Sequence, residues 1–195
     1  MRTASITRRT AETDIGLTLS LDGKGAAQCG SGVPFLDHML TVCCRQAMMD
    51  LDLHCQGDTP VDDHHSVEDI GICLGQALRQ AVGDKAGLQR YGQWLLPMDE
   101  ALVLVSLDLS GRAYLGWDVD LPTQKVGTFD TQLAREFFAA LCREAGLTLH
   151  VRQMSGFNTH HILEAIFKGV GRALRQACQQ DPALGGQVNS TKGTL

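Results

Sequence analysis

The chain has 195 residues, of which 44% are hydrophobic and 20% are charged, so it can bury a core without disulfide bridges. Its net charge of -5 argues against a general nucleic-acid or anionic-membrane surface. No apolar run reaches the ~18 residues of a bilayer-spanning helix, and the N-terminus lacks the apolar core of a secretory signal, so we expect a cytoplasmic protein with no membrane or nucleic-acid partner.

Alternation of apolar and polar residues, the period-2 pattern of a half-buried strand, begins near the N-terminus. It is followed by helical spacing of apolar residues, which predicts amphipathic helices. The first half is therefore predicted to contain three strands, a helix, a strand and a helix, at residues 3–10, 14–22, 26–29, 35–49, 51–56 and 64–82.

After a link at 83–87 the same order of patterns returns. It predicts strands at 91–97, 101–109 and 113–119, a helix at 129–145, a strand at 147–153 and a helix at 160–179. We infer an α+β fold made of two half-domains, 1–86 and 87–180, each a sheet with helices on one face, related by a pseudo-twofold. Residues 181–195 have few apolar anchors and are predicted to be a mobile tail unless a ligand or neighbour holds them.

An internal repeat supports this division. Residues 62–68 read DDHHSVE, and 96 positions later residues 158–164 read NTHHILE. The flanking segments agree as well, because GQALRQA at 75–81 returns as GRALRQA at 171–177. The seven cysteines contain no CxxC pair and are interpreted as reduced core thiols.

The repeated motif is suited to metal binding. Helix residues i and i+4 share a face, whereas adjacent residues point about 100° apart. His64 and Glu68 can therefore bind one ion while His65 faces another. The second copy repeats this pattern at His160, His161 and Glu164. Imidazole and carboxylate ligands favour manganese, iron or zinc over calcium. The alternative is a pair of helices with solvated histidines.

Together these residues make the whole chain resemble the imidazoleglycerol-phosphate dehydratase family, the manganese enzymes of histidine biosynthesis. The matching motifs are RRTAET at 8–13, FLDHML at 35–40, the two histidine motifs, SGR at 110–112 and STKG at 190–193. The resemblance implies a duplicated ribosomal-protein-S5-like half. It also implies a monofunctional form, because the chain has no length for the phosphatase domain fused in some relatives.

The resemblance implies a site with two Mn²⁺ ions. The implied ligands are His38, His64, His65, Glu68, His160, His161 and Glu164. An eighth position departs from the pattern, because this chain has Glu136-Phe137-Phe138 where many relatives have His-Phe-Phe. Since carboxylates also bind Mn²⁺, Glu136 is predicted to replace that imidazole.

The implied reaction removes water from D-erythro-imidazole-glycerol phosphate to give imidazole-acetol phosphate, through a metal-bound imidazolate. Glu12 is the first candidate for the general acid or base, and Glu68 and Glu164 are the others. Glu12 is also expected to contact the substrate. The implied phosphate-binding residues are Arg90, Arg112, Lys168, Ser190 and Lys192. Lys168 has independent support, because it lies four residues after Glu164 on the same helix face.

Two motif helices of one chain would be crowded around both ions, so we expect ligands to be shared in a homo-oligomer. The resemblance implies an octahedral assembly of twenty-four subunits. Two other functions remain open from the residues alone, a dinuclear metal hydrolase and a metal-assembled storage or structural oligomer. His54 and His150 match no ligand motif and are predicted to be structural or surface residues.

Overall fold

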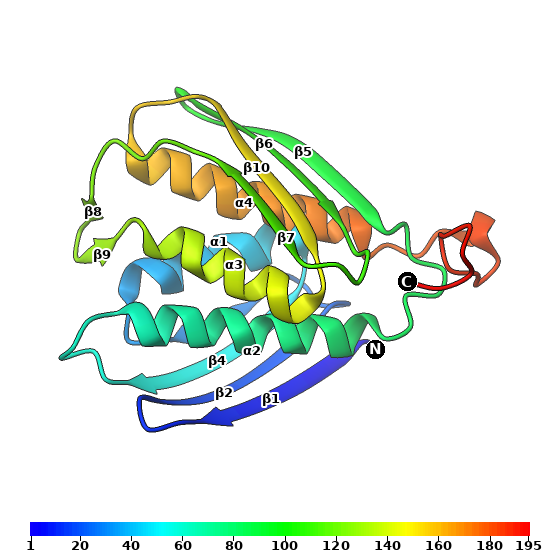
Figure 1. Cartoon of the computed structure of the whole chain (residues 1–195), viewed down its shortest axis with the longest axis horizontal. Helices are drawn as coiled ribbons and strands as arrows, with labels where there is room; N and C mark the ends of the chain where they lie inside the picture. The colour runs from blue at the N-terminus through cyan, green and yellow to red at the C-terminus, as the bar shows by residue number, and fades with distance from the viewer.

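The computed structural model describes residues 1–195, with two four-stranded sheets on the outside and four helices between them (Figure 1). Each sheet is covered on one face by the two long helices of its own half, and the helices of the two halves pack against each other. None of the helices is long and apolar enough to span a membrane.

The first half follows the predicted order. Its elements are β1 (Thr3–Arg9), β2 (Thr13–Ser20), β3 (Ala27–Gly30), α1 (Pro34–Ala47), β4 (Asp50–Gly57) and α2 (His64–Val82). The strand order is β1-β2-β4-β3, in which only β3 and β4 run parallel. Buried residues alternate along β2 and β4, as the period-2 pattern predicted, and face α1 and α2.

The second half has the same topology. Its main elements are β5 (Tyr91–Met98), β6 (Ala101–Asp108), β7 (Tyr114–Asp118), α3 (Leu133–Ala145), β10 (Thr148–Ser155) and α4 (Thr159–Ala177). The order β5-β6-β10-β7 again contains one parallel pair, β7 with β10. The predicted α+β duplication is therefore confirmed.

For the helix predicted at 129–145, the predicted start is four residues too early. The helix begins at Leu133, because the preceding residues form a small hairpin of β8 (Lys125–Val126) and β9 (Phe129–Asp130). Phe129 is buried with its ring centroid 5.1 Å from that of Phe35 in α1. Helical spacing alone cannot distinguish an apolar residue buried by this long-range contact from one buried by a helix.

The C-terminal tail packs against the link between the halves. It contains a short 3-10 helix (Pro182–Leu184) and then pairs with the link, through a bridge between Ala86 and Val188. The Gly87 amide donates to the Gln187 carbonyl at 2.9 Å. The tail therefore lies beside the junction of the two half-domains.

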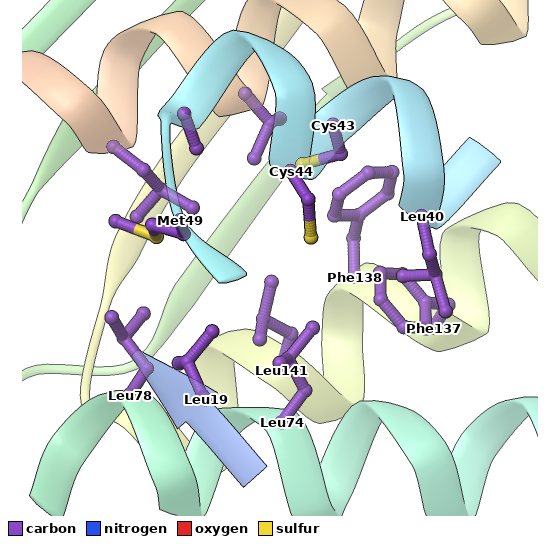
Figure 2. A pocket seen from close by; sticks show the side chains of 13 residues that line it. Leu19, Leu40, Cys43, Cys44, Met49, Leu74, Leu78, Phe137, Phe138 and Leu141 are labelled. Atoms are coloured by element: carbon purple, nitrogen blue, oxygen red, sulfur yellow. The ribbon is translucent and has the colours of Figure 1, made fainter. Parts of the chain in front are cut away.

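The four helices, together with Leu19 of β2 and Met49, line a small cavity of about 30 Å³ (Figure 2). Its lining is entirely apolar and includes Leu40 and Cys44 from α1, Leu74 from α2 and Phe138 from α3. An entirely apolar lining offers water and polar substrates no hydrogen-bond partner. The functional site therefore lies elsewhere.

Two glycines of the repeat allow the halves to pack closely. A Cβ on Gly171 of α4 would lie 2.3 Å from the carbonyl oxygen of Cys43 in α1. A Cβ on Gly75 of α2, its counterpart in the repeat, would lie 2.8 Å from the carbonyl oxygen of Leu141 in α3. Both contacts are with backbone, which cannot rotate away, so only glycine fits at these crossings.

The substitution Gly171→Ala should therefore lower the free energy of unfolding by about 1–3 kcal/mol, because α1 and α4 would have to separate. Urea denaturation followed by circular dichroism measures the effect. Gly16→Ala is the matched control, since nothing lies within 4 Å of a Cβ at that position. Equal denaturation midpoints for the two variants would contradict the close helix contact.

Candidate active site

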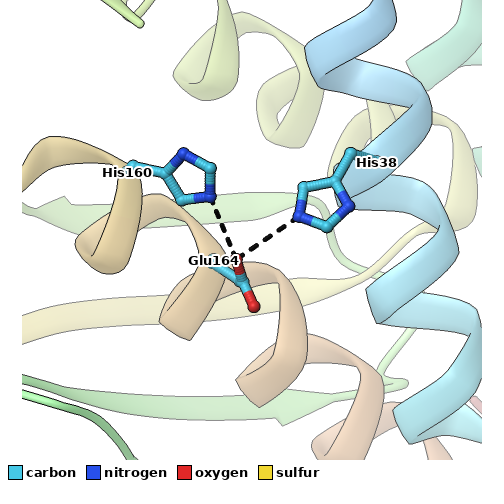
Figure 3. A group of neighbouring side chains, drawn as sticks. All are labelled: His38, His160 and Glu164. Carbon is cyan, nitrogen blue, oxygen red and sulfur yellow. Dashed lines mark hydrogen bonds and ion pairs between the residues drawn. The ribbon is translucent and has the colours of Figure 1, made fainter.

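One chain brings three of the predicted metal ligands together, at the contact between α1 and α4 (Figure 3). The Oε2 atom of Glu164 lies 3.1 Å from Nε2 of His160 and 3.4 Å from Nε2 of His38. His38 comes from the first half, and the other two come from the second. The Glu164 side chain is only 10% exposed, whereas both imidazoles are partly open to solvent.

Local interactions hold this cluster in position. The side chain of Asn158 caps α4 by accepting the backbone N–H groups of His160 and His161, at 3.0 and 3.3 Å. The second oxygen of Glu164, Oε1, lies 2.6 Å from the ammonium of Lys168, one turn further along α4. This contact agrees with the predicted helix face and leaves Oε2 directed at the two imidazoles.

The ionisation state of Glu164 also suits a metal ligand. Burial alone would raise the pKa of Glu164, but the hydrogen bond of Lys168 and those of the two imidazoles outweigh it, so this pKa lies below its ordinary value. The carboxylate is therefore ionised at neutral pH. Two imidazole nitrogens and one carboxylate oxygen, partly open to solvent, fit a divalent transition metal with coordination positions left for other ligands.

The first-half motif lies at the start of α2 and forms two separate contacts. His64 Nε2 is 3.8 Å from Glu68 Oε2, which matches the predicted i, i+4 pair. His65 points away from it, with Nδ1 3.0 Å from Asp58 and Nε2 3.7 Å from Oε1 of Glu12. The hydrogen bond with Asp58 raises the pKa of His65.

His161 has an equivalent environment in the second half. Its Nδ1 lies 2.8 Å from Oε2 of Glu100, and its Nε2 lies 3.8 Å from Asp99. Glu100 also accepts the backbone N–H of Asn158 at 2.9 Å. Mainly because of the hydrogen bond from His161, the pKa of Glu100 is lowered to about 2. An ionised carboxylate only accepts, so Nδ1 of His161 carries a proton, and the same hydrogen bond raises the pKa of His161.

The sequence patterns did not predict Asp58 and Glu100 as neighbours of the motif histidines. For Glu100 a signal existed, because Glu12 and Glu100 each stand immediately before the second strand of their half, β2 and β6. In each half, this hairpin directs a glutamate toward the second histidine of the pair. For Asp58 the sequence offered no comparable signal.

Apart from the pair of His64 and Glu68, the remaining predicted ligands do not meet one another within one chain. The His38–His160–Glu164 cluster is the only group of three or more potential metal ligands that meets. Glu68 instead lies 3.3 Å from Arg143. Glu136 is partly exposed, with Oε1 3.4 Å from its neighbour Arg135. His54 and His150 lie exposed on the outer faces of the two sheets, away from these groups.

The predicted phosphate-binding residues form two separate groups. Lys168 contacts the sulfur of Met98, the last residue of β5, at 3.6 Å, whereas Arg90 directly precedes the first residue of β5. A strand of 8 residues spans roughly 25 Å at about 3.3 Å per residue. The Lys168 group and the Arg90 group therefore lie at opposite ends of the second sheet.

Arg90, Arg112 and the tail make up the second group. Arg90 donates to Asp108 through Nε at 2.6 Å and Nη2 at 3.0 Å, and through Nη1 to the carbonyl of Asn189 at 2.7 Å. Arg112 reaches the same carboxylate at 3.8 Å. Ser190 follows Asn189 directly, and its hydroxyl accepts the backbone N–H of Lys192. The tail residues therefore lie at the start of β5.

Comparison with known proteins identifies the family. The profile of the imidazoleglycerol-phosphate dehydratase family matches residues 31–174, most of the chain. The imidazoleglycerol-phosphate dehydratases of Dinoroseobacter shibae and Ruegeria pomeroyi are 58% and 57% identical over 195 residues, with 100% of both chains covered in each case. The chain belongs to the imidazoleglycerol-phosphate dehydratase family.

Solved structures of the family agree with the fold. Imidazoleglycerol-phosphate dehydratase from Staphylococcus aureus is 42% identical, with a TM-score of 0.83 over 91% of this chain and 99% of that chain. The enzyme from Pyrococcus furiosus is 39% identical, with a TM-score of 0.84 over 97% of this chain and 100% of that one. The chain is therefore an enzyme of the hydro-lyase class, in a metal-dependent family.

A buried network ties the turn that carries Glu12 to α2. The Thr13 hydroxyl donates to Asp69 at 2.6 Å, and Arg8 forms an ion pair with the same carboxylate oxygen. Thr13 and Asp69 are both buried. The network thus holds both sides of the β1–β2 turn beside the metal motif.

Replacing this carboxylate, as in Asp69→Asn, should lower the free energy of unfolding by about 2–3 kcal/mol, because Arg8 loses its counter-charge in a mostly buried position. Thermal and urea unfolding measure the loss. Asp52→Asn is the control, since Asp52 is exposed on β4 and forms no ion pair. Equal stability of the two variants would mean that the network does not hold the turn.

Proposed function

We propose that the protein is a manganese-dependent dehydratase that converts D-erythro-imidazole-glycerol phosphate to imidazole-acetol phosphate and water in histidine biosynthesis. The observation that carries this proposal is the convergence of His38, His160 and Glu164 in a chain of this family. The donor set suits Mn²⁺, and its solvent-open side leaves room for a substrate imidazole.

The active site is proposed to hold two Mn²⁺ ions. His38, His160 and Glu164 supply ligands from one chain. The other proposed ligands are His64, His65, Glu68, Glu136 and His161. Because these side chains do not reach the His38–His160–Glu164 cluster within a single chain, we propose that further copies complete each site. A bound Mn²⁺ acts as a Lewis acid that stabilises negative charge on the substrate's imidazole ring.

Among the candidate acids and bases, the surroundings favour Glu12. Its side chain is 52% exposed, and its only charged contact is the 3.7 Å approach to His65. Glu164 is instead bound by Lys168, and Glu68 is paired with Arg143. A carboxylate that transfers a proton must be able to reach the substrate. We therefore propose that Glu12 transfers the proton and contacts the substrate.

The separation of the cationic residues supports an oligomer. One phosphate cannot contact both Lys168 and Arg90, which lie at opposite ends of β5. Sharing between copies would bring Lys168 of one chain to the Arg90, Arg112, Ser190 and Lys192 group of another. We propose that residues 1–86 and 87–180 act as one functional domain with 181–195 as its phosphate-binding tail, in an assembly of twenty-four subunits.

No feature of the site favours the metal hydrolase or the metal-storage oligomer. The family match identifies a hydro-lyase, and the paired carboxylates next to histidines are explained by its metal and proton-transfer requirements.

A dehydration assay on imidazole-glycerol phosphate tests the function. Chelation should abolish formation of imidazole-acetol phosphate, because the substrate's imidazole ring loses its Lewis acid. Added Mn²⁺ should restore the activity. Particle size is measured on the same samples, which separates loss of chemistry from loss of assembly. Turnover that survives complete metal removal, or release of inorganic phosphate in place of dehydration, would refute the proposal.

Glu136 is tested by metal content. Glu136→Gln should weaken Mn²⁺ affinity by at least about tenfold, because it removes a charged ligand, whereas Glu136→His should keep the metal. Glu144→Gln on the same helix is the control, since Glu144 contacts Gln76 and Arg143 instead. Full Mn²⁺ content in Glu136→Gln would show that Glu136 is no ligand.

A further inference from the structure

Lys85 is a nearly buried cation without a partner. It follows α2 in the link between the halves and is only 9% exposed. Its ammonium makes no hydrogen bond or ion pair with any group of the chain, whereas Lys168, also largely buried, is paired with Glu164. The ammonium is not fully enclosed, because Ser66 Oγ is the only fully buried side-chain nitrogen or oxygen without a partner. Lys85 is therefore a mostly buried cation without a counter-charge, whose head group is open to an anion from outside the chain.

The ammonium of Lys85 lies at the β6–β7 turn. Nζ is 3.6 Å from the position that a Cβ on Gly111 would occupy. Gly111 stands between Ser110 and Arg112, in a left-handed conformation with φ of 76°. The carboxyl carbon of Leu195 lies 3.5 Å from the same position, so an anionic group of the tail already approaches this place.

Cations outnumber carboxylates around Lys85. Burial lowers the pKa of Lys85, as do the nearby Arg79, Arg90 and Arg112, while Asp108 opposes the shift. Lys85 and three arginines therefore lie near two carboxylates, those of Asp108 and Leu195. Such an excess of positive charge over a partly buried position attracts a multiply charged anion.

The guanidinium of Arg90 is not available as an unpaired positive charge beside Gly111. Its guanidinium is occupied by Asp108 on one side and by the Asn189 carbonyl on the other. Arg112 is exposed and stays 3.8 Å from Asp108. Lys85 and Arg90 also share a left-handed backbone, with φ of 63° and 73°, a conformation that non-glycine residues keep only when their surroundings impose it.

We propose that Lys85 is a further phosphate-binding residue, whose ammonium adds a positive charge without an ion-pair partner to the group formed by Arg90, Arg112, Ser190 and Lys192. This inference rests on the proposed function, because it adds a residue to the phosphate end of that site. Arg90 then orders the tail through Asn189, and Lys85 binds the phosphate oxygens beside Gly111, in the place that the Leu195 carboxyl group approaches.

The variant Lys85→Met keeps the apolar stem and removes the charge. We expect about a tenfold or larger rise in KM for imidazole-glycerol phosphate and in the inhibition constant of inorganic phosphate, with kcat within about twofold of wild type. Inhibition by free imidazole, which reports on the metal end, should stay unchanged. Lys85→Arg should retain most phosphate binding, and Lys24→Met, at an exposed lysine of the β2–β3 turn, should match wild type.

Thermal unfolding separates binding from a structural role. Inorganic phosphate should raise the Tm of wild type and of Lys24→Met, but not of Lys85→Met, because a ligand stabilises only the protein that binds it. Without phosphate, Lys85→Met should be as stable as wild type or more so, since an unpaired buried charge has been removed. A lower Tm without phosphate, together with an unchanged phosphate-induced shift, would assign Lys85 to structure and overturn the proposal.

Amine acetylation of the wild-type chain, read by mass spectrometry, tests the same contact without any variant. Phosphate should protect Lys85 and leave Lys24 reactive, and equal reactivity of Lys85 with and without phosphate would contradict the proposal. If wild type dehydrates its substrate but phosphate binding does not depend on Lys85, this inference fails and the proposed function stands. If phosphate binding depends on Lys85 and no dehydration occurs, the proposed function fails and the anion site stands.

Discussion

The contact between α1 and α4 is the constraint on which the site depends. Gly171 lets α4 approach the backbone of α1 at Cys43, and this close crossing places His38 of the first half against Glu164 of the second. A side chain at position 171 would force the helices apart. Ligands that need separations of a few ångströms would then be lost, although neither helix would have changed its own conformation.

Electrostatics then determine what each carboxylate can do. Glu164 is held by Lys168 on one oxygen and faces two imidazoles with the other, so it is ionised and oriented. Glu100 accepts a hydrogen bond from Nδ1 of His161 and so orients this imidazole. Glu12, in the equivalent hairpin of the first half, approaches its histidine without a hydrogen bond. Equivalent positions of the repeat have therefore acquired different chemistry.

The two halves differ elsewhere in the same way. Asp69 of α2 anchors Arg8 and Thr13, but the corresponding position in α4 is Ala165. Lys168 corresponds to Ile72. In the first half, Asp69 thus holds the β1–β2 turn beside the histidine motif. In the second half, Lys168 instead lies beside the Glu164 carboxylate. A duplicated scaffold thus supplies matched backbone geometry, and the side chains placed on it differ between the halves.

Much of this was readable from the sequence, because it depends on local spacing. Period-2 and period-3.6 patterns located the strands and helices, and the i, i+4 rule paired His160 with Glu164 and Glu164 with Lys168. The repeat and the family motifs identified the remaining candidates. Only the tertiary structure decided that Phe129 belongs to a hairpin, that Glu100 orients His161 and that Lys85 is buried without a partner. Each of these depends on segments far apart in the chain, whose contacts no local pattern encodes.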